Sequence, residues 1–155
     1  MSDTLILGIG NLLMGDEGVG VHAISALSRE TWPDGVTVVD GGTGGFHLLD
    51  YLQGYDPIVM IDATQDGQPA GSVSVLRPKY ASDFPRSLTA HDIGLRDLIE
   101  SAALLGPLPS ITLVTVSIDE IRSMVVTLSP EVGAAIPAVS AQVRALVTAE
   151  GVGHA

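Results

Sequence analysis

The 155-residue sequence contains no cysteine, which excludes both a disulfide framework and a cysteine thiolate as catalytic nucleophile. No apolar stretch reaches the roughly 18 residues that a membrane-spanning helix needs. The first residues, Met1 to Thr4, lack the basic segment of a signal peptide. We therefore expect a soluble, cytoplasmic protein that does not insert into a membrane.

Positive charge is also scarce, since 7 Lys and Arg against 18 Asp and Glu give a net charge of −11. Nucleic acids and anionic membrane surfaces repel such an acidic protein, so neither is an expected partner. The charge suits metal ions, cationic ligands or a protein with basic patches. The length and the 46% hydrophobic residues predict one domain over residues 1–150, followed by a flexible tail at 151–155.

Several catalytic and binding motifs are absent as well. The sequence has neither a Gly-x-Ser-x-Gly nucleophile motif nor a His-Glu-x-x-His metal motif. The segment Gly8 to Asn11 follows an apolar stretch, as in dinucleotide-binding domains, but Leu13 replaces the third glycine of that fingerprint. Gly10 and Gly15 have the spacing of a phosphate-binding loop. However, Asp16 and Glu17 occupy the positions that need Lys and Ser or Thr, and these two acids would repel a phosphate group. A nucleotide-binding domain remains a third interpretation.

Apolar, β-branched segments alternate with segments of helical periodicity along the chain. The segment at 72–76 follows the strand before it too soon for a helical crossover, so we expect it to be an antiparallel edge. The alternation predicts an α/β fold of three layers, with a mostly parallel five-stranded sheet between helices. The expected strands are 4–9, 36–39, 57–61, 72–76 and 111–117. The expected helices are 18–29, 45–52, from 89 onward and from 130 onward, with Ser129 as the cap of the last one.

Three polar side chains lie where a strand ends or a helix begins. Glu17 precedes the first helix, Asp62 follows the strand at 57–61, and His91 lies in a segment that resembles a helix-capping box. In an open α/β sheet such ends converge on one edge. Two carboxylates and one imidazole can coordinate a borderline divalent metal, so the sequence predicts a metal-dependent site.

Each candidate also has a plainer structural interpretation. Asp16 and Glu17 can stabilise a helix start, Asp62 can accept hydrogen bonds in a turn, and His91 can be an ordinary helix-start residue. We interpret Asp16 as a cap or support, with a role as general base or substitute ligand left open. The glycine-rich segment from Asp40 onward has two interpretations. It is either a tight strand-to-helix connection or a functional loop that accommodates an extended peptide or folds over the site.

The order and spacing of these residues resemble the hydrogenase maturation proteases. The run from Gly8 to Gly20 is similar to the first signature of that family, and Asp40-Gly41-Gly42-Thr43 is similar to the second. Asp62-Ala63 and His91-Asp92 match its remaining marks. The resemblance implies a twisted, mainly parallel sheet. It also implies an endopeptidase that removes the C-terminal extension from the large-subunit precursor of [NiFe] hydrogenase.

The resemblance further implies that Glu17, Asp62 and His91 are the catalytic residues and bind nickel. The substrate supplies this nickel in its own active site, and other divalent metals can occupy the site in vitro. Asp16 is a further catalytic candidate, and the segment Asp40, Gly41, Gly42 and Thr43 is the candidate substrate loop. Because the sequence shows no recognisable nucleophile, a non-catalytic checkpoint that binds the precursor without cutting it is the alternative.

Overall fold

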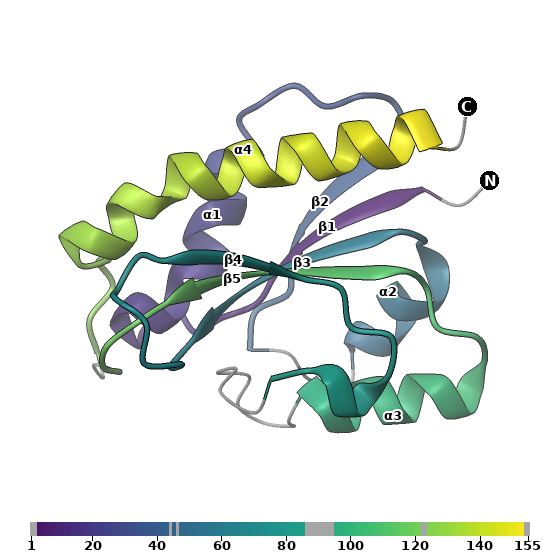
Figure 1. The fold of residues 1–155 in the computed structure, drawn as a ribbon, viewed down its shortest axis with the longest axis horizontal. Helices are drawn as coiled ribbons and strands as arrows, with labels where there is room; N and C mark the ends of the chain where they lie inside the picture. Colours follow the sequence, from purple (N-terminus) through teal and green to yellow (C-terminus); the bar gives the residue numbers. More distant parts are fainter. Residues whose placement is uncertain (1–2, 44, 46, 86–94, 122–123, 154–155) are drawn as a thin grey trace.

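A five-stranded sheet forms the middle of the molecule (Figure 1). The computed structural model describes residues 3–43, 45, 47–85, 95–121 and 124–153. The strand order is β2-β1-β3-β5-β4, and all neighbours are parallel except β4, which is antiparallel to β5. The predicted antiparallel edge strand is therefore confirmed. The strands are β1 (Thr4–Gly8), β2 (Val36–Asp40), β3 (Ile58–Thr64), β4 (Val73–Leu76) and β5 (Ile111–Ser117).

Helices cover both faces of the sheet, which confirms the predicted three layers (Figure 1). One face carries α1 (Val19–Leu27) and α4 (Pro130–Gly153), and the other carries α2 (Leu48–Gly54) and α3 (Leu95–Leu105). Two short 3-10 helices, η1 (Gly15–Gly18) and η2 (Ala81–Asp83), lie in the connections. Within the described part of the chain, each helix is too short or too polar to cross a membrane.

Two hydrophobic cores lie on the two faces of the sheet, and strand alternation assigns side chains to them. In β3, Val59 and Ile61 belong to the core beneath α1 and α4, whereas Ile58 and Met60 belong to the core beneath α2 and α3. All residues of β3 and β5 are buried because helices cover both faces of these inner strands. This burial explains why both strands carry apolar residues on both faces of the sheet.

Some boundaries differ from those expected from the sequence. The third strand continues to Thr64 because residues 62–64 pair with residues 115–117 of β5. Asp62 therefore lies inside a buried strand and not after its end. The second helix begins at Leu48 and not at 45, because a turn closed by the bond from Leu48 N–H to the Gly45 carbonyl precedes it.

The last helix begins at Pro130, as predicted, and runs without interruption through Pro137 to Gly153. It therefore enters the segment that the sequence indicated as a flexible tail. The expected capping segment at 89–92 lies outside the described residues. The segment near residue 80 contains one helical turn, η2.

Candidate functional site

The strand order reverses between β1 and β3, and this reversal locates the candidate site. The chain passes from β1 through α1 to β2 on one side, and from β3 to β4 and β5 on the other. In open α/β sheets, ligands bind beyond the carboxyl ends of the strands at such a switch point. Glu17 lies in η1, which follows β1 and contacts β3, and Asp62 lies near the carboxyl end of β3. The fold thus brings both acids to one edge.

Glu17 is a fully buried acid, with an exposed fraction of 0%. Burial raises the pKa of its carboxyl group from 4.5 to about 7, because the charged form loses its hydration. Near neutral pH this carboxyl group is therefore divided between its protonated and ionised forms. A nearby cation would favour the ionised form, which is the form that binds metals.

Asp62 is also fully buried. Its Oδ1 accepts a hydrogen bond from the Ala63 backbone N–H at 2.8 Å, which orients the carboxylate. Strand alternation places Asp62 on the same face as Met60, the face that α3 covers. His91 precedes α3 in the sequence but lies outside the described residues, so the third ligand stays a prediction. The described residues alone, without His91, contain no group of three metal-binding side chains.

Two glycines allow the backbone around Glu17 to pack closely against the sheet. A Cβ atom at Gly20 would lie 2.2 Å from the Ile9 carbonyl oxygen and 2.6 Å from that of Ile61. A Cβ atom at Gly10 would lie 2.4 Å from the Glu17 carbonyl oxygen. In the structure, these two glycines allow close approach of the protein backbone to itself.

The candidate substrate loop from Asp40 to Thr43 is attached to the neighbouring loop after β1. The Gly41 N–H donates to the Gly8 carbonyl and the Gly10 N–H donates to the Gly42 carbonyl, each at 2.7 Å. The Gly42 N–H donates to Asp40 Oδ1 at 2.8 Å, and Gly42 has a φ of +58°, which favours glycine. These contacts fit a tight strand-to-helix connection. A role in peptide binding stays a prediction.

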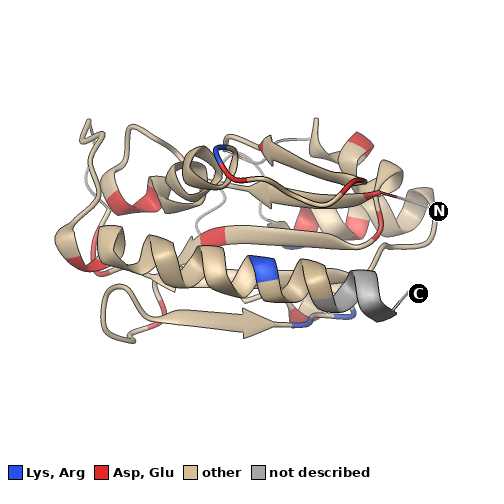
Figure 2. Cartoon of the chain, turned by 90° about the horizontal axis from the view of Figure 1, so that it is seen from above, with Lys and Arg blue, Asp and Glu red and all other residues tan. Residues whose placement is uncertain are grey.

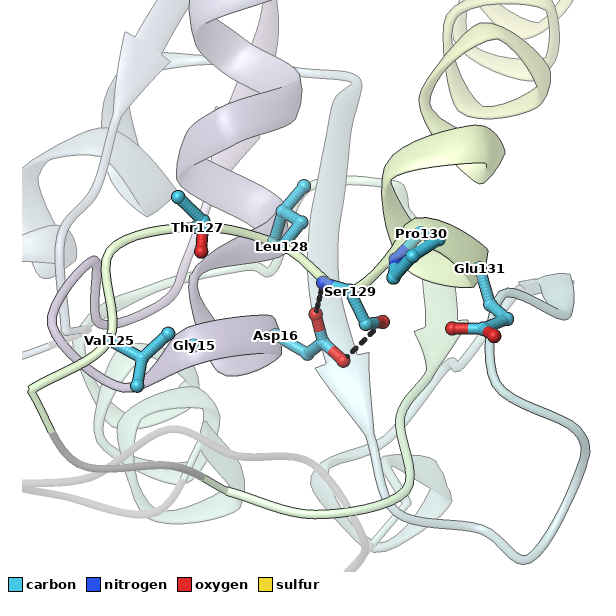
Figure 3. A pocket seen from close by; sticks show the side chains of 8 residues that line it. All are labelled: Gly15, Asp16, Val125, Thr127, Leu128, Ser129, Pro130 and Glu131. Atoms are coloured by element: carbon cyan, nitrogen blue, oxygen red, sulfur yellow. Dashed lines mark hydrogen bonds between the residues drawn. The ribbon is translucent and has the colours of Figure 1, made fainter.

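The side chain of Asp16 points from η1 toward the start of α4 (Figure 3). Its Oδ1 accepts a hydrogen bond from the Ser129 backbone N–H at 2.6 Å, and its Oδ2 accepts one from the Ser129 hydroxyl at 2.7 Å. Both residues line a cavity of about 300 Å³ between η1 and the loop before α4. This geometry fits the interpretation of Asp16 as a support, and its catalytic role stays a prediction.

We expect Asp16→Asn and Ser129→Ala to lower the free energy of unfolding by about 1–3 kcal/mol each, because each removes hydrogen bonds of a charged group. If Asp16 only supports η1, both variants should lose activity to a similar degree, and the double variant should lose less than the sum. Thermal unfolding and activity measurements test this. Asp50→Asn, at an exposed acid of α2, is the control. A far larger activity loss in Asp16→Asn would instead support a general base.

Sequence reasoning missed two long-range connections at this edge. One is the pairing of Asp16 with Ser129, which we had interpreted only as the cap of α4. The other is an isolated parallel bridge between Met14 and Val125. A serine before a proline already signals a helix start, but no sequence signal links it to an acid so far away in the chain.

Comparisons with known proteins agree with this fold. The family model described as hydrogenase maturation protease matches residues 21–145. The hydrogenase 2 maturation protease of Escherichia coli is 35% identical over 152 residues, which cover 96% of this chain and 92% of that protein. The solved structure of the hydrogenase maturating endopeptidase HybD from E. coli has a TM-score of 0.85 and 33% identity, and the match covers 96% of this chain and 94% of that one.

Other relatives match over a shorter part. The hydrogenase expression/formation protein HupD of Bradyrhizobium diazoefficiens is 38% identical over 108 residues, which cover 68% of this chain and 56% of that protein. The match thus spans about half the length of the first curated relatives.

Proposed function

Since this chain belongs to the hydrogenase maturation protease family, we propose that it is an endopeptidase that removes the C-terminal extension from a nickel-loaded [NiFe] hydrogenase large-subunit precursor. The observation that carries the proposal is the burial of Glu17 and Asp62 at the switch point of the sheet. Burying acids lowers stability, and buried acids with a raised pKa, such as Glu17, are typical of binding and catalytic sites.

The donor set suits nickel. Glu17 and Asp62 provide carboxylate oxygens, and His91 would add an imidazole nitrogen, the ligand types that borderline divalent metals accept. Three protein ligands leave coordination positions open for groups of the substrate. The nickel ion belongs to the precursor and is therefore part of the substrate. A precursor without nickel would lack the group that Glu17 and Asp62 recognise.

The residues of the chain would position the precursor and its peptide bond. Glu17 would release its proton on binding a cation, and Asp62 is oriented by the Ala63 N–H. The loop from Asp40 to Thr43 lies beside the loop that leads to Glu17 and would contact the extended peptide. When bound, nickel polarises a carbonyl group or activates water.

The test is to incubate the protein with nickel-loaded precursor and, separately, with metal-free precursor. We expect a loss of mass at the C-terminus only in the nickel-loaded sample, because only this sample offers the ion to the two buried acids. Mass spectrometry of the precursor measures the outcome. Equal cleavage of both samples would reject recognition through nickel and leave the endopeptidase activity in place.

The same experiment tests the non-catalytic checkpoint. A checkpoint would bind the nickel-loaded precursor, detectable by co-elution, and leave its mass unchanged. Such a result would replace the endopeptidase proposal.

A further inference from the structure

An exposed apolar surface lies next to the candidate site. Large apolar side chains are exposed on two short segments: Leu12 (43% exposed) and Leu13 (50%) on one, and Met124 (80%) and Val126 (54%) on the other. We call these four residues the apolar ridge. Apolar side chains gathered in this way at the edge of a domain mark interaction sites more often than scattered ones do.

The two segments of the ridge are held together by backbone hydrogen bonds. The Val125 N–H donates to the Leu13 carbonyl at 3.1 Å, and the Gly15 N–H donates to the Val125 carbonyl at 2.7 Å. Val125 lines the cavity beside Asp16 (Figure 3). Neither Met124 nor Val126 lines this cavity, and both side chains are exposed to solvent.

The backbone at Met124 is strained. Its φ is +63°, a conformation that costs free energy in any residue with a side chain. The side chain is mostly exposed, so apolar burial within this chain does not offset the cost. A contact made only with a partner would explain why a methionine occupies this position.

The ridge adjoins the switch point because Leu13 and Glu17 belong to the same short connection between β1 and α1. The Gly15 N–H, which bonds to the ridge segment, opens the 3-10 helix that contains Glu17. A polypeptide with its metal centre at Glu17 and Asp62 would therefore reach the ridge with an adjacent segment.

The charge of this edge restricts the partner. The sequence segments at the carboxyl ends of the parallel strands, residues 9–18, 40–47, 62–72 and 118–129, contain a single Lys or Arg, Arg122, which lies outside the described residues. Among the residues that the structure describes, the end of the molecule away from the two termini shows red residues and no blue ones in Figure 2. The same segments contain seven acids: Asp16, Glu17, Asp40, Asp62, Asp66, Asp119 and Glu120.

We propose that the apolar ridge docks a segment of the precursor in which apolar side chains lie next to basic ones. This inference rests on the proposed function and adds a recognition surface to it. The apolar side chains would cover Leu13 and Met124, and the basic ones would lie over the acidic edge. Opposite charges at the rim speed association and align the segment, while apolar burial supplies affinity.

The test compares wild type with the double variant Leu13→Ser/Met124→Ser on nickel-loaded precursor. We expect KM to rise roughly tenfold or more, because two exposed apolar contacts are lost, and kcat to change by less than about twofold. The KM of wild type should also rise with salt, since screening weakens attraction between exposed charges. The melting temperature should not change, because both side chains are exposed in the free protein.

The control is Leu104→Ser, which removes a leucine that is more exposed (89%) than Leu13 or Met124 and lies at the C-terminal end of α3. It should leave KM unchanged. If wild type cleaves the precursor and the double variant has the KM of wild type, the docking surface is wrong and the proposed function stands. If wild type neither binds nor cleaves the precursor, the proposed function itself fails. Self-association of wild type that the double variant loses, with KM unchanged, would show that the ridge binds a second copy instead.

Discussion

Glu17→Gln should process nickel-loaded precursor more than about 100-fold more slowly than wild type, and yet be more stable than wild type at alkaline pH. Mutating a residue that only supports a metal ligand lowers metal affinity or activity by about 10–100-fold, and loss of the ligand itself should have a larger effect. The amide keeps the size of the side chain but removes its charge. A variant that is folded, more stable and inactive would separate the role of Glu17 in binding from any role in folding.

The stability effect follows from the raised pKa. The pKa of Glu17 is about 7 in the folded protein and 4.5 in the unfolded chain, so the folded state holds the proton more tightly. Below pH 4.5 both states are protonated, and Glu17 costs nothing. Between pH 4.5 and about 7 the cost of keeping Glu17 buried grows, and above this window it reaches at most about 3 kcal/mol. Glutamine does not ionise and avoids this cost.

The measurement is the free energy of unfolding of both proteins without metal, from about pH 4 to about pH 8. The two free energies of unfolding should differ little at the acidic end of this range, and the variant should be the more stable protein at the alkaline end. A constant difference across this range would contradict a raised pKa. Cleavage by Glu17→Gln at the rate of wild type would reject its assignment as a ligand.

Glu30→Gln is the matched control with the opposite sign. Hydrogen bonds from Ser140 and then Arg144 lower the pKa of Glu30, so its ionised form stabilises the folded state at neutral pH. This stability is lost as the pH falls from the unfolded value of 4.5 through the lower folded value. Because the pair lies at the surface, replacement should cost less than about 1 kcal/mol at neutral pH.

Gly20→Ala should destabilise the protein by about 3 kcal/mol or more, which lowers the melting temperature by about 10 °C. The new Cβ atom would lie 2.2 Å from one backbone oxygen and 2.6 Å from another, and neither oxygen belongs to a flexible side chain. Helix α1 would have to move away from β1 and β3. The better helix propensity of alanine returns only about 1 kcal/mol, so the steric effect dominates.

Gly133→Ala is the control for this prediction. Gly133 lies in α4, and the nearest atom to its added Cβ, the Leu128 Cβ, is 3.9 Å away. This variant should be as stable as wild type or more stable by up to about 1 kcal/mol. Gly20→Ala should also lose activity below its melting temperature, because movement of α1 separates Glu17 from Asp62. Equal stability of the two variants would disprove the close packing around Gly20.

Much of the architecture was predictable because it depends on local patterns. The apolar segments at 57–61 and 111–117 identified the inner strands, and the short connection before 72–76 identified the antiparallel edge. The ends of strands were less predictable where pairing with a neighbouring strand extends them. From the sequence alone Asp62 was placed after the end of the third strand, because only the pairing with β5 shows that β3 continues to Thr64.

The sequence by itself determined the α/β layering and the candidate acids Glu17 and Asp62, because periodicity and residue type are local properties. The tertiary structure decided what these residues meet. It placed Asp16 against Ser129, Gly20 against two strand carbonyls, and the segment of Leu13 beside Val125. Such contacts join residues far apart in the chain, and they depend on the order of the strands. Local sequence patterns do not contain that order.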